Sequence, residues 1–401
     1  MQTKRLTMAT ETIDFVLIED AGALQQFIDE NSKVDWMSFD TEFVGEKRYV
    51  TLICLIQVGT EHGFYLIDPL KVKDLSAFFR MLENPSILKI THAGENDYRL
   101  LYREHKILPK NVFDTQVAAS FVGYKFPASF RSLVEGEAGV YLRKGYTVSN
   151  WESRPFNPKQ LKYALDDVLY LKGLWENLSS KLEKVGRTAW ANEEFAKMEK
   201  KEHYEIDYYR EALSSNMINR LSQQDQVFLI RLYEWRRATA ERKNYSKEMV
   251  LSGKLIGPIM KNINSGKAAL KNHRRIPNFV VEQFWDKFNA LHQQKITDEE
   301  REALKNIPPS LPENSGQETP MELIILLLKM KCEKEGMAQG QLFYGSNIKR
   351  MKADINFFDE KLSAGWRKTF IGEAMTHWMM NRDKLEVDFQ RAECVIRIGE
   401  G

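Results

Sequence analysis

The sequence predicts an α/β domain built on a mixed sheet, followed by regions that are entirely helical. Three observations support this prediction. Strand-like runs alternate with helical segments up to about residue 120, as in folds that cover a sheet with helices. From about residue 160 the apolar residues recur at helical spacing. Residues 307–316 are rich in Pro and Ser, which is the composition of a linker.

The first elements are strands, since they are short, apolar and rich in β-branched or aromatic residues. They are expected at 35–40, 51–58, 63–67 and 87–91. Apolar residues at helical spacing predict helices at 75–82 and 96–105. A longer amphipathic helix is expected from Pro158 to Leu178, because proline favours the first turn. These elements together predict a sheet with helices packed on it.

The rest of the chain is predicted to be helical, over 222–291 and again over 321–401. With the linker at 307–316, this organisation predicts three domains. They are a first domain at 1–200, a second at 210–297 and a third at 318–401.

The composition excludes several classes of protein. A hydrophobic content of 43% is too high for a disordered chain. The three cysteines, Cys54, Cys332 and Cys394, are far apart, which predicts neither a zinc site nor a disulfide framework. The longest apolar run, Leu323–Leu328, is far shorter than the roughly 20 residues of a membrane span. We therefore expect a cytoplasmic protein that does not enter a membrane.

Four acids and a tyrosine are the candidate catalytic residues. Asp40 and Glu42 are two residues apart, so they share one face of an extended strand. Asp97 stands at the start of a predicted helix that follows a strand. Tyr163 and Asp167 are four apart, and therefore neighbours on one helical face. Brought together, these side chains would line one cleft.

Such a cluster suits hydrolysis of phosphodiesters with two divalent metal ions. Hard cations such as Mg²⁺ or Mn²⁺ take oxygen ligands, and four neighbouring acids repel one another unless a cation neutralises them. The metal ions supply an activated hydroxide and stabilise the leaving oxygen. Asp40, Glu42, Asp97 and Asp167 are the predicted metal ligands. Tyr163 is predicted to orient or deprotonate the attacking water.

Some neighbouring residues admit two interpretations. Asp166 competes with Asp167, although the spacing of four from Tyr163 favours Asp167. His92 is either a general base or a strand-end residue whose ring hydrogen-bonds to the backbone. Gln57 either contacts a terminal nucleotide or satisfies a buried backbone group.

Two further residues also admit two interpretations each. Asp114 either has a role at the site or caps the helix that follows it. Arg154 either binds a phosphate through paired hydrogen bonds or has a local role.

Residues 34–178 resemble the DEDD-type 3′–5′ exonucleases, and among them the tyrosine subclass of ribonuclease D. Three motifs carry the likeness: Asp40-Thr41-Glu42, the run from His92 to Asp97, and Tyr163 with Asp167. The resemblance implies an RNase H-like fold and release of nucleoside 5′-monophosphates from RNA 3′ ends, tRNA precursors included. It implies no obligatory protein partner. Asn150 departs from the family pattern, which usually has Asp there, and we expect only local hydrogen bonding to differ.

A basic stretch lies between Arg231 and Arg275. It holds 12 basic and 3 acidic residues, a balance of +9 in a chain whose formal net charge is only +2. Clustered positive charge of this kind favours binding to a phosphate backbone. The same stretch resembles the HRDC module, a helical nucleic-acid-binding domain, and the tail at 318–401 is similar to a degenerate second copy. The predicted nucleic-acid-binding residues are Gln57, Arg154, Arg236, Arg237, Lys243, Lys254, Arg274 and Arg275.

The sequence therefore predicts a metal-dependent 3′–5′ exoribonuclease acting on structured RNA. Two alternatives remain open at this stage. One is an exonuclease of the same chemistry that acts on DNA, and the other is a catalytically inactive RNA-binding protein.

Overall fold

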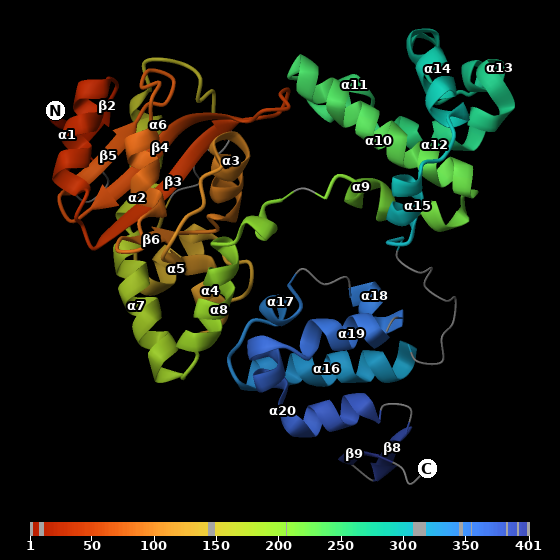
Figure 1. Cartoon of the computed structure of the whole chain (residues 1–401). Coiled ribbons are helices and arrows are strands. Elements are labelled where there is room, and N and C mark those ends of the chain that lie inside the picture. Colours follow the sequence, from red (N-terminus) through yellow and green to blue (C-terminus); the bar gives the residue numbers. More distant parts are fainter. Residues whose placement is uncertain are drawn as a thin grey trace. The chain divides into compact units, whose positions relative to one another are not determined.

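The computed structural model describes residues 3–7, 12–142, 149–205, 207–307, 318–344, 348–353, 355–381, 384–390 and 393–398 (Figure 1). The chain forms two compact units. The first comprises Met1–Phe43, Ile53–Tyr204 and Leu311–Gly401, and the second comprises Val44–Leu52 and Glu205–Ser310. Segments 1–200 and 318–401 thus belong largely to one unit, and 210–297 lies in the other. The division into three domains remains a prediction.

Seven of the described strands form one mixed sheet in the first unit, in the order β1-β2-β5-β4-β3-β6-β7. Their bounds are β1 Thr3–Thr7, β2 Thr12–Ile18, β3 Trp36–Val44, β4 Leu52–Thr60, β5 Gly63–Ile67, β6 Leu88–Thr91 and β7 Val112–Asp114. Strand β5 pairs parallel to β2 and antiparallel to β4, while β6 is parallel to both β3 and β7. The predicted mixed sheet is confirmed.

The sheet differs from the prediction in two places. The N-terminal hairpin of β1 and β2 was not predicted, although Thr12–Ile18 carries apolar residues at Ile13, Phe15 and Leu17 in a period of two. Strand β3 also continues to Val44 instead of ending at residue 40. Asp40 and Glu42 therefore both lie within β3.

Helices of the first unit accompany these strands. They are α1 Ala21–Asn31, α2 Ser76–Glu83, α3 Glu95–His105, α4 Thr115–Ser120, α5 Phe130–Ala138, α6 Pro158–Leu169, α7 Leu171–Lys184 and α8 Thr188–Met198, with the 3₁₀ helix η1 at Lys201–His203. The predicted helices at 75–82 and 96–105 are confirmed as α2 and α3. The single long helix expected from Pro158 is instead two helices, α6 and α7, which meet at Tyr170.

Buried aromatic side chains tie the sheet to its helices. The ring of Phe39 on β3 stacks 5.9 Å from Tyr98 on α3 and lies 6.2 Å from Phe78 on α2. Phe27 on α1 meets the Tyr65 ring of β5 edge-on at 4.7 Å. Burial of large aromatic groups dominates the stability of such a core. The core thus fixes β3, and with it the side chains on the opposite face of that strand.

The tail of the chain packs on this same core. Its helices are α16 Glu318–Lys334, α17 Gln339–Leu342, α18 Ile348–Ala353, α19 Ile355–Leu362 and α20 Gly365–Met380. Trp366 lies edge-on to Phe121 at 5.0 Å, and Arg187 donates 2.8 Å hydrogen bonds to the carbonyls of Phe121 and Glu335. Helix α20 is interrupted at Gly372, whose φ of 76° favours glycine.

The prediction that the tail is entirely helical is wrong at its end. Strands β8 (Leu385–Gln390) and β9 (Glu393–Ile398) form an antiparallel hairpin. Most of the predicted linker at 307–316 lies outside the described residues. Among the helices described, none is long and apolar enough to cross a membrane.

The second unit is helical, as predicted, around a hydrophobic cluster of its own. Its elements are α9 Arg210–Leu213, η2 Ile218–Arg220, α10 Gln223–Lys243, α11 Lys247–Val250, α12 Gly253–Asn262, η3 Ile263–Ser265, α13 Gly266–Asn272, α14 Asn278–Gln293 and α15 Asp298–Leu304. Trp235 on α10 lies edge-on to Phe284 and Phe288 on α14, at 5.0 and 5.5 Å. These contacts join the two longest helices of the unit.

Candidate active site

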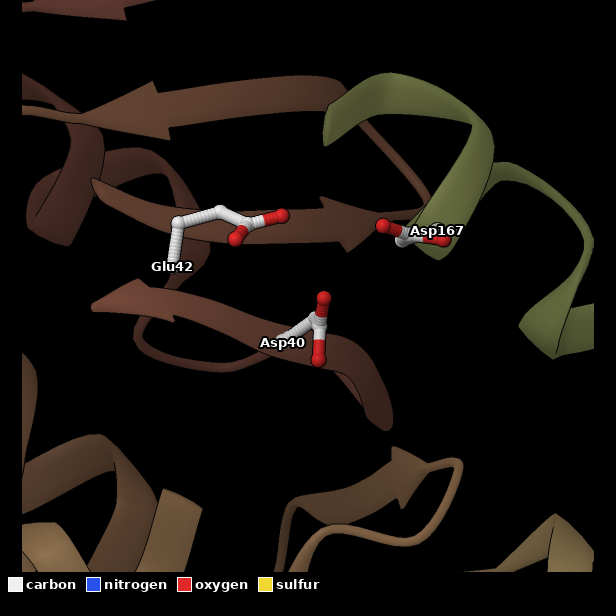
Figure 2. A group of neighbouring side chains, drawn as sticks. All are labelled: Asp40, Glu42 and Asp167. Carbon is white, nitrogen blue, oxygen red and sulfur yellow. The ribbon is translucent and has the colours of Figure 1, made fainter. Parts of the chain in front are cut away.

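Three carboxylates converge where β3 and α6 approach each other. Oxygen atoms of Asp40, Glu42 and Asp167 all lie within 4.8 Å of one another. Figure 2 shows the three side chains pointing into the same space, two from β3 and one from α6. The convergence predicted from the spacing on the strand and on the helix is present for these three acids.

The start of α6 sets the position of Asp167. Asn157 caps the helix by accepting hydrogen bonds from Lys159 N and Gln160 N, and the Gln160 side-chain oxygen accepts one from Asn157 N. Such a capping box fixes the first turn. Asp166 points elsewhere, because its carboxylate pairs with Lys162 at 2.8 Å. The choice of Asp167 over its neighbour thus agrees with the geometry.

Asp97 lies beside the three-acid cluster but is not part of it. It sits in the first turn of α3, with only 7% of its surface exposed, and accepts a hydrogen bond from the Thr41 hydroxyl. Its charge acts on the site all the same, since it raises the pKa of both Asp40 and Glu42. The structure therefore groups three of the four predicted ligands and sets the fourth close by.

The loop that leads into α3, just before Asp97, is held by Asp114, a role that was not predicted. Asp114 caps α4 through Gln116 N and Val117 N, and its other oxygen accepts from Gly94 N at 2.9 Å. A Cβ atom at Gly94 would lie only 2.7 Å from the Thr91 hydroxyl, so only glycine fits. The capping interpretation of Asp114 agrees with this geometry. Its second bond, to the loop before α3, depends on a chain approach that local sequence does not reveal.

His92 is a supporting residue in this loop. Its Nδ1 lies 3.0 Å from the Thr115 hydroxyl, and its ring contacts Phe130. Burial lowers the pKa of His92 to about 4, so the ring is neutral near pH 7. A backbone hydrogen bond to Ala128 is also present. These contacts favour the strand-end interpretation over the general base.

Tyr163 lies one turn before Asp167 on α6. Its hydroxyl donates a hydrogen bond to the Asp167 carboxylate, which lowers the pKa of that acid against the larger effect of burial. The phenol ring packs 6.1 Å from the ring of the buried Trp151. The hydroxyl of Tyr163 is thus held at the edge of the acid cluster.

The four acids are strongly coupled electrostatically. Burial, followed by repulsion from neighbouring carboxylates, raises the pKa of Glu42 to about 9 and that of Asp167 to about 8. Burial raises the pKa of Asp97 to about 6 and places that of Asp40 well above its ordinary value. A site of this kind binds protons unless a cation compensates the charge. The all-oxygen donor set therefore fits hard divalent cations such as Mg²⁺ or Mn²⁺.

Two of the predicted RNA-binding residues near this site are turned to other uses by the fold: Gln57 is buried, and the partly buried Arg154 is held by protein groups. Gln57 on β4 is 0% exposed. The Arg154 guanidinium donates to both carboxylate oxygens of Asp68, at 2.5 and 2.8 Å, and to the carbonyls of Cys54 and Trp151. It also lies 3.8 Å from the ring of Phe156. Arg154 anchors its own loop, and the phosphate-binding interpretation of this residue is not supported.

Arg236 in the second unit is likewise turned inward. Its side chain is 3% exposed, pairs with Glu211 and Glu248, and donates to the Leu251 carbonyl at 2.7 Å. A guanidinium used in this way is not available to RNA, so its prediction as an RNA contact is corrected. Its neighbour Arg237 is partly exposed and lies 3.9 Å over the ring of Tyr208.

The other predicted RNA-binding side chains are exposed. They are Lys243, Lys254, Arg274 and Arg275. Lys254 and Arg275 line a groove of about 780 Å³. Phe279, which is 66% exposed, lies in the same groove. This aromatic residue was not predicted, because an exposed phenylalanine on an amphipathic helix has the same local pattern as a buried one.

Comparison with known proteins agrees with this geometry. The profile of the 3′–5′ exonuclease family matches residues 15–183. Ribonuclease D of Nitrobacter hamburgensis is 28% identical over 341 residues, which are 84% of this chain and 88% of the relative. Ribonuclease D of Gluconacetobacter diazotrophicus is 26% identical over 390 residues, which are 95% and 96% of the two chains.

A solved structure has the same fold. RNase D of Escherichia coli, described as an exoribonuclease involved in structured RNA processing, matches with a TM-score of 0.76 at 23% identity. The match covers 91% of this chain and 98% of that protein. The fold, the acid cluster and the full-length relatives lead to one conclusion. The chain belongs to the ribonuclease D family of DEDD-type 3′–5′ exonucleases and is an exoribonuclease.

Proposed function

We propose that this exoribonuclease trims the 3′ ends of structured RNA precursors, tRNA among them, and releases nucleoside 5′-monophosphates. The convergence of Asp40, Glu42 and Asp167 beside Asp97 is the observation that carries the proposal. Two divalent cations, Mg²⁺ or Mn²⁺, held by these four acids would supply an activated hydroxide and neutralise charge on the phosphate. The tRNA substrate follows from the family resemblance.

The chain's own residues prepare the site for this reaction. Asp97 is buried and the other three acids are partly buried, so charge interactions with a phosphate are stronger there than in water. Asp114 and His92 hold the loop that leads into α3, the helix that carries Asp97. Tyr163, fixed by its bond to Asp167, offers its hydroxyl oxygen to orient the attacking water.

The test uses the purified full-length chain and a tRNA with a 3′ extension. With Mg²⁺ or Mn²⁺ we expect stepwise shortening and release of nucleoside 5′-monophosphates, and with chelator neither. Matched RNA and DNA oligonucleotides are compared in the same assay, and faster hydrolysis of RNA is expected. Failure to release mononucleotides with either metal would favour an inactive RNA-binding protein. Faster hydrolysis of DNA than of RNA would favour an exonuclease of the same chemistry that acts on DNA.

Replacing Tyr163 with phenylalanine is expected to lower kcat by about 10²-fold, because the hydroxyl that positions the water is lost. RNA affinity should change little, since the ring and its packing against Trp151 remain. Single-turnover kinetics and equilibrium RNA binding separate these effects. An unchanged kcat would remove Tyr163 from the mechanism.

We further propose that RNA binds along the groove of Lys254, Arg275 and Phe279. The cationic side chains suit phosphates, and the exposed ring offers a platform for a base. Changing Lys254 and Arg275 together to alanine is expected to weaken RNA binding. It should also reduce the slope of log affinity against log salt by about 0.7 for each lost phosphate contact.

The matched control for this groove removes two lysines of the same unit. Lys267 and Lys271 pair with Glu282 at 3.1 and 2.8 Å. The double alanine variant makes the same change in net charge outside the groove. Equal salt slopes for the two double variants would contradict a specific role of the groove.

A further inference from the structure

A fully buried amide lies in the central part of the sheet without a hydrogen-bond partner. Gln57 on β4 is 0% exposed, and neither its Oε1 nor its Nε2 has a partner among the described residues. Buried polar groups are nearly always hydrogen-bonded, because leaving one unpaired is costly. The nearest chain neighbours of Gln57, Ile56 and Val58, are buried apolar residues of the core. The amide therefore needs an explanation.

The register of β3 and β4 indicates what Gln57 faces. The two strands are neighbours in the sheet and are joined by residues 45–51. Parallel neighbours need a crossover of about a dozen residues or more, so this short connection makes the pair antiparallel. The Ser38 hydroxyl donates to the Gly59 carbonyl. Two residues later on β3 and two residues earlier on β4, this register sets Gln57 opposite Asp40.

The two side chains also lie on the same face of the sheet. A Cβ atom built at Gly59 would lie 2.4 Å from the Ser38 hydroxyl, so these positions share a face. Because side chains alternate along a strand, Asp40 and Gln57 share that face too. Opposite residues of an antiparallel pair have Cβ atoms about 4.5–5.5 Å apart. A glutamine amide can reach a carboxylate over that distance.

The other residue in register with Gln57 belongs to β5. On the far side of β4, Gln57 pairs in register with Leu66 of β5, whose side chain is apolar. The hydroxyl of Ser38 is already bonded to the Gly59 carbonyl. Asp40 is thus the polar side chain that the register sets against Gln57.

We propose that Gln57 is a positioning residue for Asp40, and that its amide N–H donates to the Asp40 carboxylate when that carboxylate holds a divalent cation. Carboxylates that bind metals are commonly fixed by hydrogen bonds from a surrounding shell, and loss of such a bond weakens metal binding by about 10- to 100-fold. The proposal rests on the metal-dependent function proposed above. It explains why a strand interior keeps an amide that has no hydrogen-bond partner among the described residues.

The experiment measures Mn²⁺ binding to the full-length chain by calorimetry, without RNA. Gln57→Leu removes the amide, and Gln57→Met removes it while keeping the length of the side chain. Both variants are expected to bind Mn²⁺ about 10- to 100-fold more weakly than wild type. In chelator both should melt at or above the wild-type temperature, because an unpaired buried amide is gone.

Two outcomes would overturn the role of Gln57. One is wild-type affinity for Mn²⁺ in both variants. The other is a large loss of thermal stability in chelator, which would mean that the amide stabilises the metal-free fold instead. Asp40→Asn tests the underlying site separately. If wild type and Asp40→Asn bind Mn²⁺ equally, or neither binds it, the proposed metal site itself is wrong.

Discussion

Asp40→Asn is expected to abolish RNA hydrolysis while raising the thermal stability of the metal-free protein. Asparagine keeps the shape of the side chain but removes the charge that a divalent cation needs, which costs several kcal/mol of transition-state stabilisation. A loss of at least about 10³-fold in kcat/KM follows. Stability should rise because desolvation and the charges of Asp97, Asp167 and Glu42 all raise the pKa of Asp40.

Asp166→Asn is the matched control. It removes one carboxylate next to Asp167 in the sequence, yet Asp166 pairs with Lys162 and lies outside the cluster. We expect nearly wild-type hydrolysis from this variant. Assays of mononucleotide release and melting curves in chelator check both effects. Wild-type turnover by Asp40→Asn, or equal losses in the two variants, would contradict the site.

The acids could be predicted from sequence because their spacing determines the face on which each one lies. Residues two apart on a strand, or four apart on a helix, share a face, and this can be inferred without knowing any distant contact. That β3 and α6 come together in space cannot be inferred from local spacing. It was expected only from the resemblance to a known family. The loop before α3 was not predictable in the same way, because Asp114 reaches Gly94 across 20 residues.

The errors among the basic residues have a related cause. Arg154 has the local context of an exposed arginine, but its partner Asp68 lies 86 residues earlier in the chain. Arg236 belongs to a strongly basic stretch, yet its side chain is turned toward Glu211 and the Leu251 carbonyl. Net charge over a window describes attraction to phosphate, but it does not show which side chains are buried.

Some missed elements did carry a local signal. In β8, Leu385, Val387 and Phe389 alternate with polar residues, which is the period-two pattern of a strand. The same pattern occurs in β2. Both segments lie next to helices, and the helical composition around them outweighed the short alternating run.

Metal binding and pH are expected to be linked in this protein. Folding raises the pKa of Glu42 to about 9, of Asp167 to about 8 and of Asp97 to about 6. The folded metal-free chain therefore holds more protons than the unfolded chain between about pH 4 and 9. Stability changes with pH according to the protons bound by each state, so these groups destabilise the metal-free fold as pH rises through that window.

Melting curves in chelator should thus show a higher melting temperature at pH 6 than at pH 8, and the stabilisation by Mn²⁺ should be larger at pH 8. Each proton bound in excess by the folded chain changes stability by about 1.4 kcal/mol per pH unit. Lys89 acts in the opposite direction above about pH 7, because burial lowers its pKa to about 7.

The variant Glu42→Gln separates the acids from Lys89, which it leaves unchanged. Removing Glu42, whose pKa is raised to about 9, should flatten the fall in melting temperature between pH 6 and 8. It should also weaken the stabilisation by Mn²⁺. If wild type and Glu42→Gln had the same pH dependence in chelator, the acid cluster would not be the source of the linkage. Since cation binding must displace these protons, a flatter profile with weaker Mn²⁺ binding would tie both effects to the same carboxylates.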